Sequence, residues 1–211
     1  MGQIKNIIFD LGGVIINLDI PKTIAEFNKL SQKPFESIYT QLQQSPIFDK
    51  FDKGQITESD FFSELQQSIN QTTSTQHLVN AWNAMLLDFP KHRLELLDIL
   101  KPKYRLFLLS NTNETHVTEF ERSLHQQHGY QNLEPFFEKV YYSCRMGMRK
   151  PDSEIFDFVL NQHQLNAAET VFIDDSIQHV EGALKTGIQA HLLPKELEVQ
   201  DLIRSLGLMQ F

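Results

Sequence analysis

The chain has 211 residues, of which 41% are hydrophobic and 22% are charged, a composition that argues against a disordered chain and against a coiled coil. The formal net charge of −8 argues against nucleic acid as a partner. The only cysteine, Cys144, excludes an intrachain disulfide and favours a reducing, cytoplasmic compartment.

The first predicted element is a buried strand over residues 4–10, an apolar run that ends in Asp10. The next four residues are Leu11-Gly12-Gly13-Val14, so the strand ends in a glycine turn. Open α/β sheets form their ligand crevice at the carboxyl ends of their strands. A carboxylate at that position can act as a nucleophile or as a metal ligand, which makes Asp10 the first candidate site residue.

Residues 18–88 form a long stretch that is polar, glutamine-rich and helical in period, without a convincing strand. Four apolar side chains at helical spacing mark one amphipathic helix: Phe61, Phe62, Leu65 and Ile69. Thr57 is expected to cap the start of that helix. Because so long a stretch exceeds any ordinary loop, we expect an inserted helical domain over residues 18–88. The core domain would then comprise residues 1–17 and 89–211.

Four more strands are predicted beyond the insertion, at residues 104–111, 139–143, 170–174 and, at the sheet edge, 190–193. A closing helix is expected over residues 196–206. Strands that alternate with helical patterns are typical of an α/β fold with a mainly parallel sheet. Since no secretory signal pattern and no apolar stretch of about 18 residues occur, we expect neither a targeting segment nor a membrane partner.

Polar residues follow the second strand of the predicted sheet. Ser110, Asn111 and Thr112 supply a hydroxyl and backbone N–H groups at a strand end, and such groups can hold the oxygens of an anion. The same residues are also ordinary in turns, so on their own they leave both interpretations open.

Charged residues follow the next two strands. Lys150 precedes Pro151 at a predicted helix start, where an ammonium can balance a carboxylate and a phosphate together, although most lysines are merely solvated. Asp174 and Asp175 come directly after a buried strand and repel each other unless a cation or hydrogen-bond donors compensate. Carboxylate oxygens suit Mg²⁺, whereas a helix N-cap explains one acid better than two.

Taken in order at successive strand ends, these residues resemble the four motifs of the haloacid dehalogenase superfamily of phosphotransferases. The resemblance covers essentially the whole chain and points to subfamily I. It implies a Rossmann-like three-layer core with an all-helical cap inserted after the first strand. The amino-acid sequence at residues 110–113, 147–151 and 180–183 most resembles that of the bacterial α-glucose-1-phosphate phosphatases of that superfamily.

The resemblance also implies a nucleophile and a metal site. Asp10 would attack phosphorus and form an aspartyl phosphate. Mg²⁺ would bridge Asp10 and the substrate phosphate, held by the Asp175 carboxylate and the Gly12 backbone carbonyl. Asp174 would support the ion directly or through water.

A phosphate site is implied beside the metal. Ser110 and the backbone amides near Leu11, Asn111 and Thr112 would hold the phosphoryl oxygens. Lys150 would stabilise the charge on the nucleophile and on the transferring group.

Gly12 departs from the pattern of many relatives, which carry a second aspartate there as general acid and base. That group contributes about 10²- to 10⁴-fold in rate, so the enzyme is slow, restricted to good leaving groups, or served by a substitute. His116 is a candidate substitute that would contact the substrate. His179, at a position where many relatives carry asparagine, would cap a helix or orient an acid.

The predicted function is that of a Mg²⁺-dependent phosphatase for a small phosphorylated metabolite, with a sugar phosphate favoured. Gly12 leaves open a catalytically weakened domain that binds a phosphorylated ligand or a protein. A 2-haloacid dehalogenase is less favoured, because those relatives do not use a magnesium site of paired acids. The oligomeric state cannot be read from the sequence.

Overall fold

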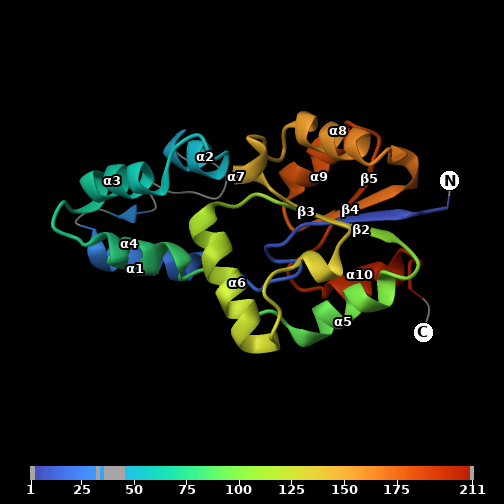
Figure 1. Ribbon diagram of the computed structural model, residues 1–211, viewed down its shortest axis with the longest axis horizontal. Coiled ribbons are helices and arrows are strands. Elements are labelled where there is room, and N and C mark those ends of the chain that lie inside the picture. The colour runs from blue at the N-terminus through green and yellow to red at the C-terminus, as the bar shows by residue number, and fades with distance from the viewer. Residues whose placement is uncertain (1–2, 32–33, 36–45, 210–211) are drawn as a thin grey trace.

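The computed structural model describes residues 3–31, 34–35 and 46–209 of the chain. Figure 1 shows a sheet flanked by helices at one end of the molecule and a group of helices at the other. The strands are β1 (Asn6–Phe9), β2 (Arg105–Ser110), β3 (Lys139–Tyr142), β4 (Thr170–Asp174) and β5 (Gln189–Leu192). The helices are α1 (Ile20–Leu30), α2 (Pro46–Asp52), α3 (Glu58–Ile69), α4 (Thr75–Asn83), α5 (Lys91–Leu100), α6 (Glu114–His128), α7 (Ser143–Met146), α8 (Ser153–Gln162), α9 (Ile177–Leu184) and α10 (Val199–Ser205), with short 3₁₀ turns η2 (Glu134–Phe136) and η3 (Ala167–Glu169).

The strands form one parallel sheet in the order β3-β2-β1-β4-β5, which confirms the predicted α/β fold class. Phe9 of β1 is in register with Leu108 of β2 and with Ile173 of β4. Because the strands are parallel and aligned, Asp10 and Asp174 leave the sheet side by side at its carboxyl edge. The register of the strands therefore places the candidate acids Asp10 and Asp174 side by side.

Side chains of the central strands are buried on both faces of the sheet. Ile7 and Phe9 pack into one apolar cluster with α5, α6 and α10, whereas Ile8 packs into another with α8 and α9. Figure 1 shows α8 and α9 on one side of the strands and α5 and α10 on the other. A sheet covered on both faces explains why these strands are continuous apolar runs rather than alternating ones.

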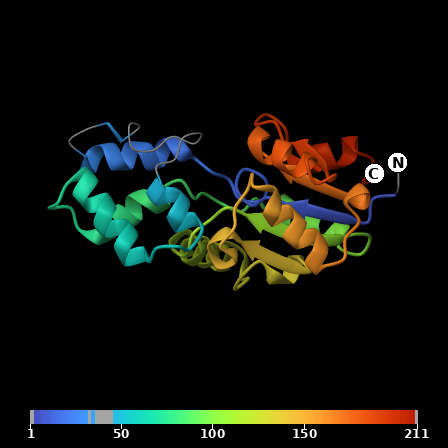
Figure 2. The ribbon, with the colours of Figure 1, turned by 90° about the horizontal axis from the view of Figure 1, so that it is seen from above.

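Helices α1 to α4 pack around an apolar cluster of their own at the far end of the molecule (Figure 2). Its buried members all lie between residues 27 and 82, and they include the four side chains of the predicted stripe on α3. Thr57 caps α3 as predicted, in a reciprocal capping box with Asp60. The division of the chain at residues 18 and 88 stays a prediction, and this separate core supports it.

The strand prediction over residues 139–143 was one residue too long, because Ser143 begins α7. The Ser143 Oγ, which has a single proton to donate, lies 2.6 Å from the Asp52 carbonyl oxygen and 3.0 Å from the Thr112 carbonyl oxygen, and these contacts tie the start of α7 to α2 and to the turn after β2. At β5 the strand ends at Leu192, and the Leu193 N–H donates to the Asp174 carbonyl, 2.8 Å away.

Among the described residues, no helix is long and apolar enough to cross a membrane.

Candidate active site

A cavity of about 1000 Å³ opens between the carboxyl edge of the sheet and helices α1, α2 and α4. Asp10, Ser110 and Asp175 line it from the sheet. Asp52 and Trp82 line it from the helical part. The cavity thus joins the strand ends, where the candidate residues cluster, to side chains of the inserted segment.

Lys150 is the buried cation of this site. Its Nζ lies 2.8 Å from Asp10 Oδ1 and 2.6 Å from Asp174 Oδ2, and its side chain is fully buried. Burial favours the neutral amine, but the two carboxylates outweigh it and hold the pKa of Lys150 above its ordinary value. The structure therefore brings three of the predicted residues into direct contact.

Asp10, Asp174 and Asp175 each place a carboxylate oxygen within 4.8 Å of the others. Burial and the charge of Asp174 raise the pKa of Asp10. Burial and the charges of Asp10 and Asp174 raise the pKa of Asp175 to about 7. Burial also raises the pKa of Asp174, but Lys150 and His179 outweigh it and bring that pKa down to about 2. The three carboxylates together therefore carry more negative charge than the single ammonium group of Lys150 balances.

Of the two roles expected for His179, capping a helix or orienting an acid, the contacts fit the second, because the imidazole lies against Asp174. Its Nδ1 lies 2.9 Å from Asp174 Oδ1, which also accepts the backbone N–H of Ser176 at 2.8 Å. Both oxygens of Asp174 are held by the protein, so this carboxylate is fixed in orientation. Asp175 is the less constrained member of the pair of acids.

The side chain of Asn111 holds the loop that carries Lys150. Its Nδ2 donates to the Lys150 carbonyl at 2.8 Å, and its Oδ1 accepts the Lys150 N–H at 2.9 Å. This pair of bonds fixes the lysine backbone against the end of β2. The sequence pattern gave Asn111 only a backbone contact to phosphate and did not reveal this positioning contact.

The backbone donors expected to hold phosphate divide into two groups. Within the described residues, no hydrogen bond occupies the N–H of Leu11 or of Asn111, so both remain available to an anion. The Thr112 N–H instead donates to Ser143 Oγ at 2.9 Å. We therefore correct the expectation for Thr112, whose amide supports α7 and not a ligand. Ser110 is buried at the end of β2 and lines the cavity.

The glycine turn after β1 is crowded in a way that depends on the missing side chains. A Cβ at Gly12 would lie 2.6 Å from Leu18 Cδ1. Gly13 has φ of +69°, and a Cβ there would lie 2.3 Å from Asp175 Oδ2. Gly13 is therefore required by both conformation and space, whereas Gly12 is opposed only by the end of one flexible side chain.

His116 lies on α6, where that helix meets the helical part of the molecule. Its Nε2 is 3.1 Å from the Trp82 carbonyl and its ring stacks on the Trp82 indole at 4.9 Å. Its Nδ1 lies 3.4 Å from Asn113 Nδ2. Burial lowers the pKa of His116 to about 4, so the imidazole is neutral at pH 7. It lines the cavity, but both ring nitrogens already have protein partners, which weakens the case for proton transfer.

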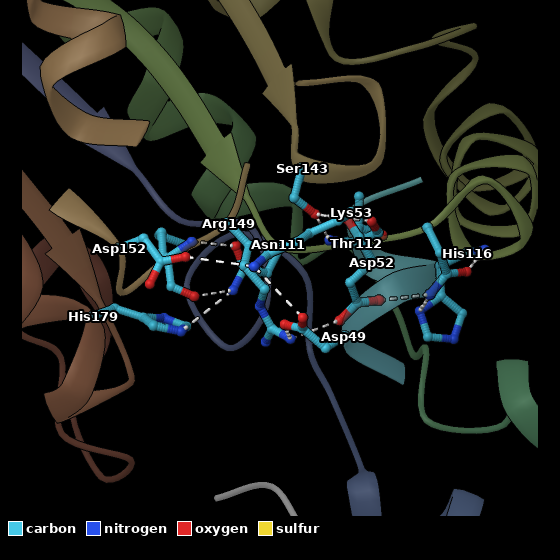
Figure 3. A network of polar contacts seen from close by, with 12 residues as sticks. Asp49, Asp52, Lys53, Asn111, Thr112, His116, Ser143, Arg149, Asp152 and His179 are labelled. Atoms are coloured by element: carbon cyan, nitrogen blue, oxygen red, sulfur yellow. Dashed lines mark hydrogen bonds and ion pairs between the residues drawn. The ribbon is translucent and has the colours of Figure 1, made fainter. Parts of the chain in front are cut away.

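A polar network connects α2 to the core across the cavity (Figure 3). Asp52 Oδ1 accepts Asn113 Nδ2 at 3.3 Å. Arg149 Nη1 lies 2.9 Å from Asp49 Oδ1 and 3.8 Å from Asp52 Oδ2. Lys53 Nζ lies 3.5 Å from Asp49 Oδ2. No local pattern in the sequence pointed to Asp49, Asp52 or Lys53, because charged side chains at a helix surface are normally solvated.

The chain was compared with known proteins. Residues 7–193 match the family described as haloacid dehalogenase-like hydrolase. The chain is 28% identical over 187 residues to D-ribitol-5-phosphate phosphatase of Bacteroides thetaiotaomicron, covering 89% of this chain and 90% of that protein. It is also 28% identical over 185 residues to a sesquiterpene phosphatase of Aspergillus oryzae, covering 87% of each.

Several solved structures are similar to the chain over nearly the full length. One of them is a HAD family enzyme from Bacteroides thetaiotaomicron, in an alanine-for-aspartate variant complexed with magnesium and inorganic phosphate. The TM-score is 0.89 at 34% identity, with 95% of this chain and 99% of that chain covered. These similarities confirm the superfamily that the four sequence motifs predicted.

Proposed function

The chain belongs to the haloacid dehalogenase-like hydrolase family and is a phosphoric monoester hydrolase, and on that premise we propose that it hydrolyses a sugar or sugar-alcohol phosphate through an aspartyl phosphate on Asp10. The observation that carries the proposal is the buried ammonium of Lys150 between Asp10 and Asp174. The lysine favours the ionised form of Asp10 against burial and the charge of Asp174, and it fixes the direction of the carboxylate. A carboxylate nucleophile needs both effects. We place the reaction in the cytoplasm, in line with the single cysteine.

The residues present fit Mg²⁺. Asp10, Asp174 and Asp175 supply only oxygen ligands, which this ion prefers, and together they carry more negative charge than Lys150 balances. Within the described residues no hydrogen bond occupies the Gly12 carbonyl, so it is available as a further ligand. When bound, the ion would neutralise charge on the phosphoryl group and orient it.

The chain's own groups account for the two halves of the proposed reaction. An oxygen of Asp10 bonds to phosphorus as the ester oxygen departs with the P–O bonding electrons. Water then attacks phosphorus and loses a proton to the solvent, and the Asp10–phosphorus bond breaks with its electrons returning to the carboxylate, which releases inorganic phosphate. We propose that the N–H groups of Leu11 and Asn111, with the Ser110 hydroxyl, hold the phosphoryl oxygens. Their position in the cavity lining and the absence of a hydrogen-bond partner for either N–H within the described residues support this.

Proton transfer is the step for which the site lacks its usual group. Gly12 has no carboxyl, so we propose that the leaving oxygen takes its proton from water. We expect the missing group to cost about 10²- to 10⁴-fold in rate for esters whose leaving oxygen is strongly basic. Aryl phosphates, whose leaving oxygen needs no proton, should lose far less.

A panel of phosphate monoesters tests the proposal. The panel is assayed with Mg²⁺, with EDTA, and with Asp10→Asn. We expect turnover only with Mg²⁺ and a loss of at least 10³-fold in Asp10→Asn, because the amide is a poor nucleophile. Asp98→Asn, the same change on the exposed face of α5, is the matched control and should keep full activity. Activity that persists in Asp10→Asn would rule out the covalent route.

A further inference from the structure

The cavity contains a carboxylate, Asp52, that no step of the proposed reaction uses. Asp52 ends α2, and only 12% of its side chain is exposed. It lines the same cavity as Asp10 but belongs to the helical part, so it faces the space left for the ester group. Burial raises the pKa of Asp52 to about 6 against the opposing influence of Arg149, and the group is mostly ionised at pH 7.

We propose that Asp52 is a specificity-determining residue that accepts hydrogen bonds from hydroxyl groups of the leaving alcohol and so selects uncharged polyol phosphates. This inference rests on the proposed function and deepens it. The two curated relatives named above act on a sugar-alcohol phosphate and on a sesquiterpene phosphate, so similarity alone does not choose between a polar and an apolar leaving group.

The hydrogen bonding of Asp52 leaves acceptor capacity. A carboxylate has about four lone-pair positions. Asn113 Nδ2 donates to Oδ1 at 3.3 Å, while Arg149 Nη1 stands 3.8 Å from Oδ2, beyond a normal hydrogen bond. A buried carboxylate that is short of donors gains free energy from each hydroxyl that reaches it, and an apolar leaving group would remove its water without replacing those bonds.

Asn113 fixes the direction of this carboxylate. Its Oδ1 lies 3.3 Å from Trp82 Nε1 and accepts the His116 N–H at 3.1 Å, so the amide cannot turn. Its Nδ2 is therefore held toward Asp52. Because Asn113 starts α6 directly after the phosphate-binding turn of β2, it sets the distance between the phosphate end and the hydroxyl end of the cavity.

The surrounding charges favour a neutral leaving group. A second anionic group would meet Asp52 and Asp49, both on α2. An ammonium group would meet Arg149, whose guanidinium lies within 4 Å of both acids. Hydroxyl groups carry no net charge and avoid both repulsions, whereas they can still donate to Asp52.

The test compares kcat/KM for esters of matched size: a five-carbon polyol phosphate, pentyl phosphate, 5-aminopentyl phosphate, a five-carbon polyol bisphosphate and an isoprenoid phosphate. In the unmodified enzyme we expect the polyol monophosphate to exceed each of the others at least tenfold. Asp52→Asn keeps shape and removes the charge, and it should lower the polyol-to-pentyl ratio about 10- to 100-fold, the effect of losing hydrogen bonds to a charged group.

Asp157→Asn is the matched control, since it makes the same change on the exposed face of α8, outside the cavity lining. It should leave the polyol-to-pentyl ratio within threefold. An unchanged ratio in Asp52→Asn, an equal fall in Asp157→Asn, or a preference of the unmodified enzyme for the pentyl, amino, bisphosphate or isoprenoid ester would overturn the inference. If Asp52→Asn does not fold, the kcat/KM values of the unmodified enzyme for the polyol ester and for the other esters still test whether the site selects uncharged polyol phosphates.

The two proposals fail in different ways. If the enzyme hydrolyses an aryl phosphate with Mg²⁺ through Asp10 but shows no dependence on Asp52, only the inference about specificity is wrong. If no ester is hydrolysed under any condition, the proposed function is wrong as well.

Discussion

Replacing Lys150 with methionine removes the cation around which the site is built. Methionine nearly matches the length and volume of lysine but carries no charge. Asp10 and Asp174, each within 2.8 Å of Nζ in the native site, would be left with buried charge that no lysine balances. We expect the variant to be inactive and less stable, and to regain part of the lost stability in Mg²⁺.

The size of the effect follows from burial. Breaking a buried ion pair by removing one partner costs about 3–5 kcal/mol, because the remaining charge is left without compensation. For a protein of this length each kcal/mol shifts the unfolding midpoint by about 2–4 °C, so we expect a fall of about 6–20 °C at pH 7. Lys53→Met is the matched control. Lys53 also lies near two carboxylates, at 3.5 and 3.6 Å, but it is partly exposed and should lose less than about 1 kcal/mol.

The dependence of this loss on pH gives a second check. In the native protein the pKa of Asp174 is held at about 2, below its ordinary value. Its ionised form therefore adds stability above about pH 4, and that stability is lost as the pH falls toward 2. Without Lys150 this contribution is absent, so the two proteins should differ most at pH 7 and less near pH 2, below which Asp174 is protonated in both. Thermal unfolding at both pH values measures this, and a deficit below about 1 kcal/mol at pH 7, or one that grows toward pH 2, would refute the reasoning.

Three further predictions follow from the same site. Gly12→Asp supplies the missing carboxyl and should raise turnover of alkyl phosphates more than that of aryl phosphates, because its Cβ would meet only the end of the flexible Leu18 side chain, 2.6 Å away at Cδ1. A variant that is no faster than the native enzyme on alkyl phosphates, even with Leu18→Ala added, would contradict this. The pKa of Asp52 in the folded protein is about 6, against an ordinary value near 3.9. The protonated form of Asp52 therefore adds stability below about pH 4, and that stability is lost as the pH rises through 6. Between pH 4 and 7, urea unfolding should show the free energy of unfolding of Asp52→Asn gaining up to about 3 kcal/mol relative to that of the native protein. Mg²⁺ at 100 times its Kd should stabilise the native protein by about 2.7 kcal/mol, and at the same concentration Asp175→Asn should gain less than half of that in calorimetry.

Features that depend on neighbours along the chain could be predicted from the sequence. The strand that ends in Asp10 is an apolar run closed by glycines, and the Thr57 cap uses a partner three residues away. The motif order placed Asp10, Lys150 and Asp174 at successive strand ends, and a parallel sheet brings such ends to one edge. The family, and the acids that we propose as magnesium ligands, followed from that order, since each motif is a local signal.

Contacts between distant segments were decided only by the tertiary structure. Asn111 was expected to offer a backbone amide, yet its side chain holds Lys150, 39 residues later. The Thr112 amide is used by Ser143, which the sequence pattern had placed in a strand. Asp52 had no local signal, because an acid on a polar helix is normally solvated, and it becomes a buried cavity group only when α2 docks against Asn113 and Arg149. Local sequence thus determined the fold and pointed to the proposed nucleophile, whereas long-range packing decided which polar groups remain available to a ligand, because hydrogen-bond satisfaction depends on every element that meets at the site.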